Sequence, residues 1–315
     1  MKTVIKKLTI NLISILLVLA IFYFLGREFV HDWGKIKSYS FNFNFGLLTL
    51  SIVLYAITFF FLSLGLYLIL KYFHKKIPFY ENWLYFCITQ PAKYIPGKIW
   101  MAVARMKFFK PHEIPNPITF LATGTESVLE IFAGAYISLV AILQTDLLGN
   151  SSFWGTIVVS AFGLLFLYPP VFYFFINLYL RIVRLPLIEK HQRVSFLKIL
   201  LLQIIYALAM AGFGISHLVF LQSFAPVASQ YFPFLISIGS FSYVASMIAL
   251  FAPSGLGVRE GIWFLALKTL VASPVAIIYA FASRIWTIVV EAILLFICLP
   301  LFWIKRNGAR TKNMV

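Results

Sequence analysis

The chain has 315 residues, of which 62% are hydrophobic, 18% aromatic and only 11% charged. Its mean hydropathy is +0.93, which excludes a soluble globular domain because a water-facing surface needs far more charge. The formal net charge of +16 does not indicate nucleic-acid binding, since the Lys and Arg residues form short clusters between apolar runs. That pattern is typical of membrane proteins. The sequence therefore predicts an all-α, polytopic integral membrane protein.

Apolar runs long enough to cross a bilayer recur along the chain, since about 20 residues of helix span its hydrocarbon core. The first run, residues 8–25, follows a basic start that resembles a signal peptide. It lacks a small-residue cleavage site, so we expect it to be retained as a span. The other predicted runs are 46–70, 115–143, 153–180, 196–223, 231–252, 256–272 and 274–304.

The basic clusters predict an orientation in the cytoplasmic membrane. Both tails and the strongly basic loop 181–198 are expected in the cytoplasm. Lys76 and Lys110 then fall on the same side, so residues 80–110 must enter and leave by the cytoplasmic face. By the same parity, residues 231–272 must enter and leave by the outer face. We therefore expect about six full spans and two oppositely oriented, broken or re-entrant hairpins.

Each predicted hairpin contains a Pro-Gly element, Pro96-Gly97 in the first and Pro253-Ser254-Gly255 in the second. Pro removes a backbone donor and Gly admits unusual dihedrals, so each element should end one short helix and start another. The two elements lie 157 positions apart, and Glu126 and Arg284 lie 158 positions apart. A matched offset with opposite orientation predicts an inverted repeat. Its halves are about 46–143 and 196–304, within one domain, 1–315.

These breaks are the predicted binding site. Irregular backbone is tolerated within a membrane where it is buried or lines a wet cavity, and a helix start presents free N–H groups that favour an anion. Neighbouring Lys and Arg residues favour a phosphate. Lys93, Lys98, Lys107 and Lys110 have the alternative of snorkelling to anionic head groups. The predicted head-group site comprises Tyr94, Pro96, Gly97, Lys98, Arg105, Gly255, Gly257, Arg259 and Glu260.

Four further ionisable residues are predicted to form an internal charge network. Glu126 and Glu130 share one helix face, and Arg284 and Glu291 share another. The simplest arrangement lets Arg284 neutralise Glu126 or Glu130. This network is either a static ion pair or the lining of a charged pathway in which a carboxylate takes up a proton. For Arg259 and Glu260 the alternative to head-group binding is likewise structural: an internal ion pair that caps a helix.

No sequence motif predicts an enzyme, a cofactor or a metal site. The chain has no Gly-x-x-x-x-Gly-Lys-Ser/Thr loop, His-Glu-x-x-His, Gly-x-Ser-x-Gly or Cys/His cluster. Cys87 and Cys298 are expected to be packing residues without a partner. His217 is expected to be packed or hydrogen-bonded. Trp100 and Trp263, which follow the two breaks, are expected in interfacial belts, with capping of a lipid groove as the alternative.

The two breaks also carry a family resemblance. Tyr94-Ile-Pro-Gly-Lys-Ile-Trp100 followed by Arg105, a span with Glu126, and Pro253-Ser-Gly-Leu-Gly-Val-Arg-Glu-Gly261 resemble the transmembrane region of lysylphosphatidylglycerol synthetases. That region also occurs alone as a flippase-like membrane protein family. The resemblance covers essentially the whole chain, and residues 255–261 are its most specific part. Lys98 and Ser254 depart from it, because relatives often have Gly there, and this puts the width of the first break in doubt.

The resemblance implies lipid translocation and a homodimer. It does not imply synthase activity, since the separate soluble synthase domain has no counterpart in these 315 residues. The family's signature elements fall on Tyr94, Pro96, Gly97, Arg105, Gly255, Gly257, Arg259, Glu260 and Gly261.

The sequence thus favours translocation of an anionic phospholipid or a polyprenyl-phosphate-linked lipid. The alternative is an embedded enzyme, or a non-catalytic subunit that accompanies a lipid-modifying enzyme such as a glycosyltransferase. A purely structural scaffold leaves the two breaks unexplained.

Overall fold

A computed structural model gives the fold of most of the chain. The described residues are 23, 26–27, 29–38, 42–95, 99–143, 152–182, 187–190, 193–249 and 252–312. Every regular element in these ranges is a helix. Five helical segments are long and apolar enough to cross a membrane: Phe45–Tyr72 (α3), Asn116–Leu143 (α6), Phe196–Gln222 (α9), Ser229–Ile248 and Ser273–Arg306. The chain is therefore an all-helical, membrane-embedded protein. Apart from residue 23, the predicted span 8–25 lies outside the described residues.

The remaining helices are shorter, except for the last. They are α2 (Trp33–Ser38), α4 (Phe79–Thr89), η1 (Gln90–Tyr94), α5 (Trp100–Phe109), η2 (Lys110–His112), α7 (Ser152–Leu167), α8 (Pro169–Ile182), η5 (Ser229–Tyr231), α10 (Phe232–Ile248), η6 (Pro253–Gly255), α11 (Val258–Leu267) and α12 (Ser273–Lys312). At 1.5 Å per residue, α11 is about 15 Å long, roughly half the thickness of a bilayer core.

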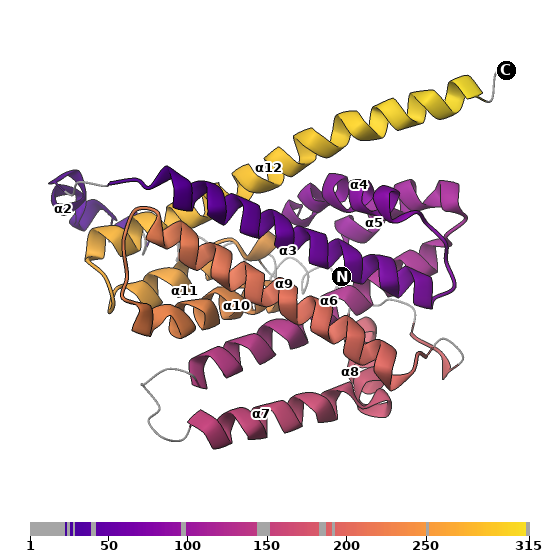
Figure 1. Cartoon of the computed structure of the whole chain (residues 1–315), viewed down its shortest axis with the longest axis horizontal. Helices are drawn as coiled ribbons and strands as arrows, with labels where there is room; N and C mark the ends of the chain where they lie inside the picture. Colours follow the sequence, from indigo (N-terminus) through magenta and orange to yellow (C-terminus); the bar gives the residue numbers. More distant parts are fainter. Residues whose placement is uncertain are drawn as a thin grey trace, which may run out of the picture.

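Helices α3 and α9 form the centre of the molecule and run antiparallel, side by side (Figure 1). At one end the backbone N–H of Asn44 donates to the Ser223 carbonyl over 2.6 Å. At the other end the Lys198 ammonium lies 5.1 Å from the Tyr72 ring centroid. Gly65 permits this close approach, because a Cβ atom there would lie 2.5 Å from the Tyr206 ring.

Two further helix pairs flank this centre: α10 packs against α6, and α4 packs against α12. Ser138 on α6 and Ser237 on α10 each donate to the other's carbonyl, over 3.2 and 2.7 Å. Gly214 and Gly239 lie face to face where α9 crosses α10, and a Cβ on Gly239 would lie 2.8 Å from the Gly214 Cα. Small residues allow such close crossings in membrane proteins.

The segment from α4 to η2 turns back on itself. Glu81 near its start lies beside His112 near its end, with 3.0 Å between Oε2 and Nε2, a distance at which a protonated His112 forms an ion pair with it. Lys305, late in α12, pairs with the same carboxylate. The α10–η6–α11 segment lies at the opposite end of the molecule from α4 and α5 (Figure 1). It begins soon after α9 ends and leads into the start of α12.

The single span predicted for residues 153–180 is wrong. The structure divides it at Tyr168 into α7 and α8. The Phe166 and Phe175 ring centroids are 5.2 Å apart, whereas nine residues along a straight helix rise about 13.5 Å. The chain therefore folds back at Pro169-Pro170, where neither residue can donate a backbone hydrogen bond.

Candidate functional site

The two predicted breaks differ in how much of them is described. Regular α-helix in the first hairpin ends at Thr89 and continues as the 3-10 helix η1 to Tyr94. Pro96, Gly97 and Lys98, three predicted head-group residues, lie outside the described residues. The second break separates α10 from α11 at the predicted place.

The backbone of the second break is left-handed at three positions. The φ angles of Ser254, Gly255 and Gly257 are 50°, 68° and 86°. Glycine adopts this region at no steric cost. At Gly255 space matters as well, because a Cβ atom would lie 2.0 Å from the Ser246 Cβ.

Arg284 on α12 connects the two breaks. Its Nη1 donates to the Ser254 carbonyl over 3.1 Å, and its guanidinium lies 5.2 Å from the Tyr94 ring centroid. Its Nε is 3.6 Å from the Glu260 carboxylate. The predicted pairing of Arg284 with Glu126 or Glu130 is therefore wrong, because this side of α12 faces the breaks and contacts Glu260 of α11 instead.

Glu291, two helical turns after Arg284, holds the first break to α12. Its carboxylate accepts from Lys93 over 2.6 Å, from the Tyr94 hydroxyl over 3.0 Å and from the Tyr55 hydroxyl over 2.9 Å. Lys93 therefore faces an internal carboxylate rather than snorkelling to the surface. Tyr55 was missed at the sequence level, because nothing in a long apolar helix distinguishes it from the other 15 tyrosines.

Arg105 on α5 lies in a closed, buried ion pair. Its Nη1 donates to Glu126 and, over 3.2 Å, to Thr123, and its Nη2 donates to Glu126 over 3.2 Å. The guanidinium also lies 5.3 Å from the Phe86 ring centroid. Its side chain is 0% exposed. Arg105 was predicted to bind a head group, but the structure commits it to Glu126.

Arg259 and Glu130 are buried without an ion pair to any described residue. The Tyr243 hydroxyl donates to Glu130 over 2.9 Å. The Arg259 guanidinium lies 4.7 Å from the Phe213 ring centroid and 5.8 Å from that of Tyr243. Its Nε is buried without a hydrogen-bond partner. Tyr243 therefore links the two unpaired groups.

Glu260 caps α11 and does not pair with its neighbour Arg259. Its Oε2 accepts the Gly257 N–H over 2.7 Å. The sequence predicts free N–H groups at the half-helix start, but the chain's own carboxylate occupies this one. Among the described residues, Arg259 is therefore left without a carboxylate partner, whereas Lys93, Arg105 and Arg284 each face one.

These ionisable side chains form what we term the central charge cluster, which consists of Lys93, Arg105, Glu126, Glu130, Arg259, Glu260, Arg284 and Glu291. Seven of its eight members are buried, and the Lys93 side chain is 26% exposed. Three cations face carboxylates of the cluster, and Arg259 does not. A buried charge without a counter-ion is costly.

Five other residues considered in the sequence analysis have clear positions. Trp263 is fully buried, and its ring stacks on His217 with centroids 5.7 Å apart, so the belt position predicted for it is wrong. His217 Nδ1 lies 3.2 Å from the Phe213 carbonyl, in line with a packed, hydrogen-bonded histidine. Trp100 is 42% exposed. Cys87 and Cys298 are free thiols, but they are neighbours across α4 and α12 rather than isolated residues.

The fold and this cluster define the class of the protein: an all-helical membrane protein with a buried, charged centre. No protein-family model and no curated protein matches the chain.

Proposed function

We propose that the protein translocates an anionic, phosphate-bearing lipid or glycolipid across the cytoplasmic membrane, as the resemblance to the transmembrane region of lysylphosphatidylglycerol synthetases implies. The observation that carries this proposal is the unpaired Arg259. Its guanidinium is buried beside the second break without a counter-ion among the described residues. An anion from outside the chain would neutralise it.

A second arginine supports a phosphate as that anion. Arg284 also has unmatched donors, because its Nε and Nη2 are buried without hydrogen-bond partners. Guanidinium groups bind phosphate through paired N–H donors and remain charged at every physiological pH. In this proposal the phosphate binds at Arg259 and Arg284, while the lipid's chains remain in the bilayer. Arg105 has no part in binding in this proposal, because Glu126 already neutralises its charge, and it stabilises α5 against α6.

The contacts between helices support an inverted repeat and two opposed re-entrant hairpins. We equate α3, α4–α5 and α6 with α9, α10–α11 and α12. Under this correspondence α3 packs on its equivalent α9, and the pair of α10 with α6 is equivalent to the pair of α4 with α12. A pseudo-twofold axis that relates the two halves requires each helix contact to be matched by a contact between the equivalent helices. Binding between two repeats allows a lipid site to open alternately to either face.

Translocation in proteoliposomes tests the proposal. Purified protein is reconstituted with head-group-labelled lysylphosphatidylglycerol, phosphatidylglycerol or a polyprenyl-phosphate sugar. We expect movement of one lipid class, and Arg259→Gln should slow it about tenfold or more through loss of a charged contact. Lys110→Gln is the matched control, because it removes a charge from an exposed residue outside the cluster.

Two outcomes would contradict the proposal. One is folded Arg259→Gln protein that moves lipid at the wild-type rate. The other is folded wild-type protein that moves none of the three lipids, which would favour a subunit role beside a lipid-modifying enzyme.

A further inference from the structure

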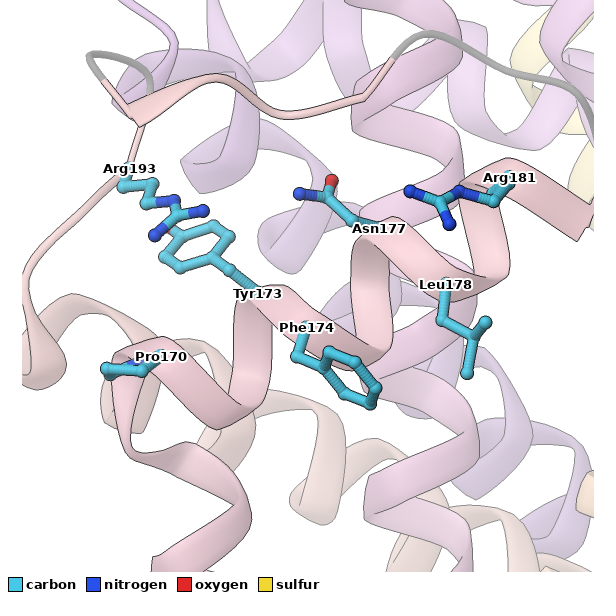
Figure 2. Close-up of a pocket in the computed structure, with 7 residues that line it drawn as sticks. All are labelled: Pro170, Tyr173, Phe174, Asn177, Leu178, Arg181 and Arg193. Carbon is cyan, nitrogen blue, oxygen red and sulfur yellow. The ribbon is translucent and has the colours of Figure 1, made fainter.

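A second basic site lies on α8, away from the central charge cluster. It is a cavity of about 370 Å³ between α8 and the segment that follows it (Figure 2). Its lining includes Tyr173, Phe174, Asn177, Leu178, Arg181 and Arg193. None of these residues belongs to the central charge cluster.

Two side chains of α8 hold the following segment in place and so build the cavity. The Asn177 amide donates to the Ile188 carbonyl over 3.2 Å and accepts the Ile188 N–H over 2.8 Å. The Tyr173 hydroxyl accepts the Val194 N–H over 2.7 Å. These three bonds fix the chain on both sides of residue 190. As a result, Arg193 is held over α8.

The cavity combines cationic and apolar walls. The Arg193 guanidinium lies 5.1 Å from the Tyr173 ring centroid, and Arg181 lies further along the same side of α8 (Figure 2). No lining residue is acidic. Phe174 and Leu178 are 63% and 41% exposed and provide an apolar wall beside the two arginines. An anionic head group joined to an apolar chain matches both walls.

Two further cavities lined by basic residues lie on the described part of the chain. Arg193 also lines a neighbouring cavity of about 270 Å³ together with His74 and Lys198. A third cavity, of about 290 Å³, is lined by Lys71, Lys75 and Lys76. The position of Arg181 in the last turn of α8 has a simpler explanation, the helix dipole. That explanation does not apply to Arg193, which lies outside α8.

We propose that Arg181 and Arg193 bind the phosphate of an anionic phospholipid whose acyl chain lies along Phe174 and Leu178. The site is separate from the proposed translocation site. It would hold a lipid at the membrane surface.

Native mass spectrometry of the purified full-length protein tests this site. Phosphatidylglycerol, phosphatidylcholine and glycerol phosphate serve as probes. We expect the double variant Arg181→Gln/Arg193→Gln to retain at least about tenfold less phosphatidylglycerol, since it loses two charged contacts. Phosphatidylcholine retention should not change. Phe174→Ala should weaken retention of phosphatidylglycerol but not of glycerol phosphate.

Arg306→Gln is the matched control. Arg306 also stacks on an aromatic ring, 5.4 Å from the Trp303 centroid, but it does not line this cavity. Arg259→Gln controls for lipid held at the central charge cluster and should leave this site occupied. Equal loss in Arg306→Gln, or wild-type retention in a double variant with a wild-type melting temperature, overturns the proposal. Displacement of phosphatidylglycerol by equimolar glycerol phosphate also overturns it, because the ligand would then be a free phosphate.

Discussion

Arg105 and Arg259 show two ways in which this protein buries a guanidinium. Arg105 is 21 positions from Glu126 and contacts it through two nitrogens. Arg259 has two aromatic rings in place of a carboxylate. A desolvated cation–π contact contributes about 2 kcal/mol or somewhat more, whereas burying an ion costs several kcal/mol, so the rings offset only part of the cost of burying the Arg259 charge. At the residue scale, Arg105 is therefore paired within the protein, and Arg259 is the group that we propose binds the anion.

Glu126→Gln should destabilise the protein, because it leaves the Arg105 charge buried and uncompensated. Breaking a buried ion pair in this way costs about 3–5 kcal/mol. Thermal unfolding in detergent, followed by circular dichroism, measures the effect as a lower melting temperature.

Glu130→Gln is the control for this prediction, four residues along the same helix. The Tyr243 hydroxyl can still donate to a glutamine oxygen, so the loss should be about 1 kcal/mol or less. Equal melting temperatures for the two variants would show that the Arg105–Glu126 pair does not stabilise the fold.

The protein should also lose stability in acid through Glu81, near the start of α4 and outside the five candidate spans. Burial raises the pKa of this carboxyl group, but hydrogen bonds from Lys305 and Tyr85 and the charge of His112 outweigh burial and hold the pKa below its usual value of 4.5. A depressed folded-state pKa stabilises the protein above the unfolded value, and this contribution is lost as the pH falls through the folded value.

The melting temperature of the wild type should therefore drop more steeply below about pH 4.5 than that of Glu81→Gln. If the melting temperatures of the wild type and of Glu81→Gln fall equally over this pH range, the contacts of Glu81 with His112 and Lys305 do not contribute to acid stability.

At the scale of elements, the second break depends on its glycine. Gly255→Ala should destabilise the α10–α11 hairpin by at least about 1–3 kcal/mol, because alanine is strained at a φ of 68° and its Cβ would clash with Ser246. Unfolding by heat measures the global loss, and proteolysis near residue 255 measures local opening.

Gly34→Ala provides the comparison for this substitution. Gly34 lies in α2, where a Cβ atom meets nothing within 4 Å. This variant should melt at or slightly above the wild-type temperature, since alanine favours a helix over glycine. If Gly255→Ala has the same melting temperature as Gly34→Ala, the stability of the fold does not depend on glycine in the left-handed turn.

The long elements could be predicted from hydropathy, and the broken ones only in part. The predicted runs 46–70, 115–143 and 196–223 agree with α3, α6 and α9 within a few residues. The prediction of a single span for residues 153–180 was wrong, because the segment is apolar throughout and its hydropathy does not reveal the fold-back at Pro169-Pro170. Hydropathy reports whether a segment can enter a membrane, but the direction of the chain there depends on backbone donors and on packing against α6.

The candidate site was also predictable in part. Composition and motif placed Glu126, Glu130, Arg259, Arg284 and Glu291 in the interior, and all five are buried. Their partners were not predictable, because the ion pairs depend on how α5, α11 and α12 rotate about their axes. Spacing along one helix fixes which residues share a face. It does not fix what that face meets.

At the scale of the whole molecule, the two opposed hairpins that we propose predict which residues share a side of the membrane. Lys75→Cys and Lys110→Cys should react with a membrane-impermeant thiol reagent from one side, and Ser229→Cys and Thr269→Cys from the other. Cys87→Ala/Cys298→Ala protein in oriented vesicles provides the background. Reaction of Lys75→Cys and Lys110→Cys from opposite sides would exclude a re-entrant first hairpin.

The distance in sequence between ion-pair partners has a consequence for biogenesis. Arg105 precedes Glu126 by 21 residues, whereas Lys93 precedes Glu291 by 198 residues. At ribosomal rates of about 5–20 residues per second, Lys93 must wait on the order of ten to forty seconds for its partner. During that interval we expect the first hairpin to stay at the membrane surface or to be bound by an insertion factor. It should take its final position only after α12 has been synthesised. Truncation of the nascent chain before residue 291 should therefore leave Lys93 accessible to water-soluble amine reagents.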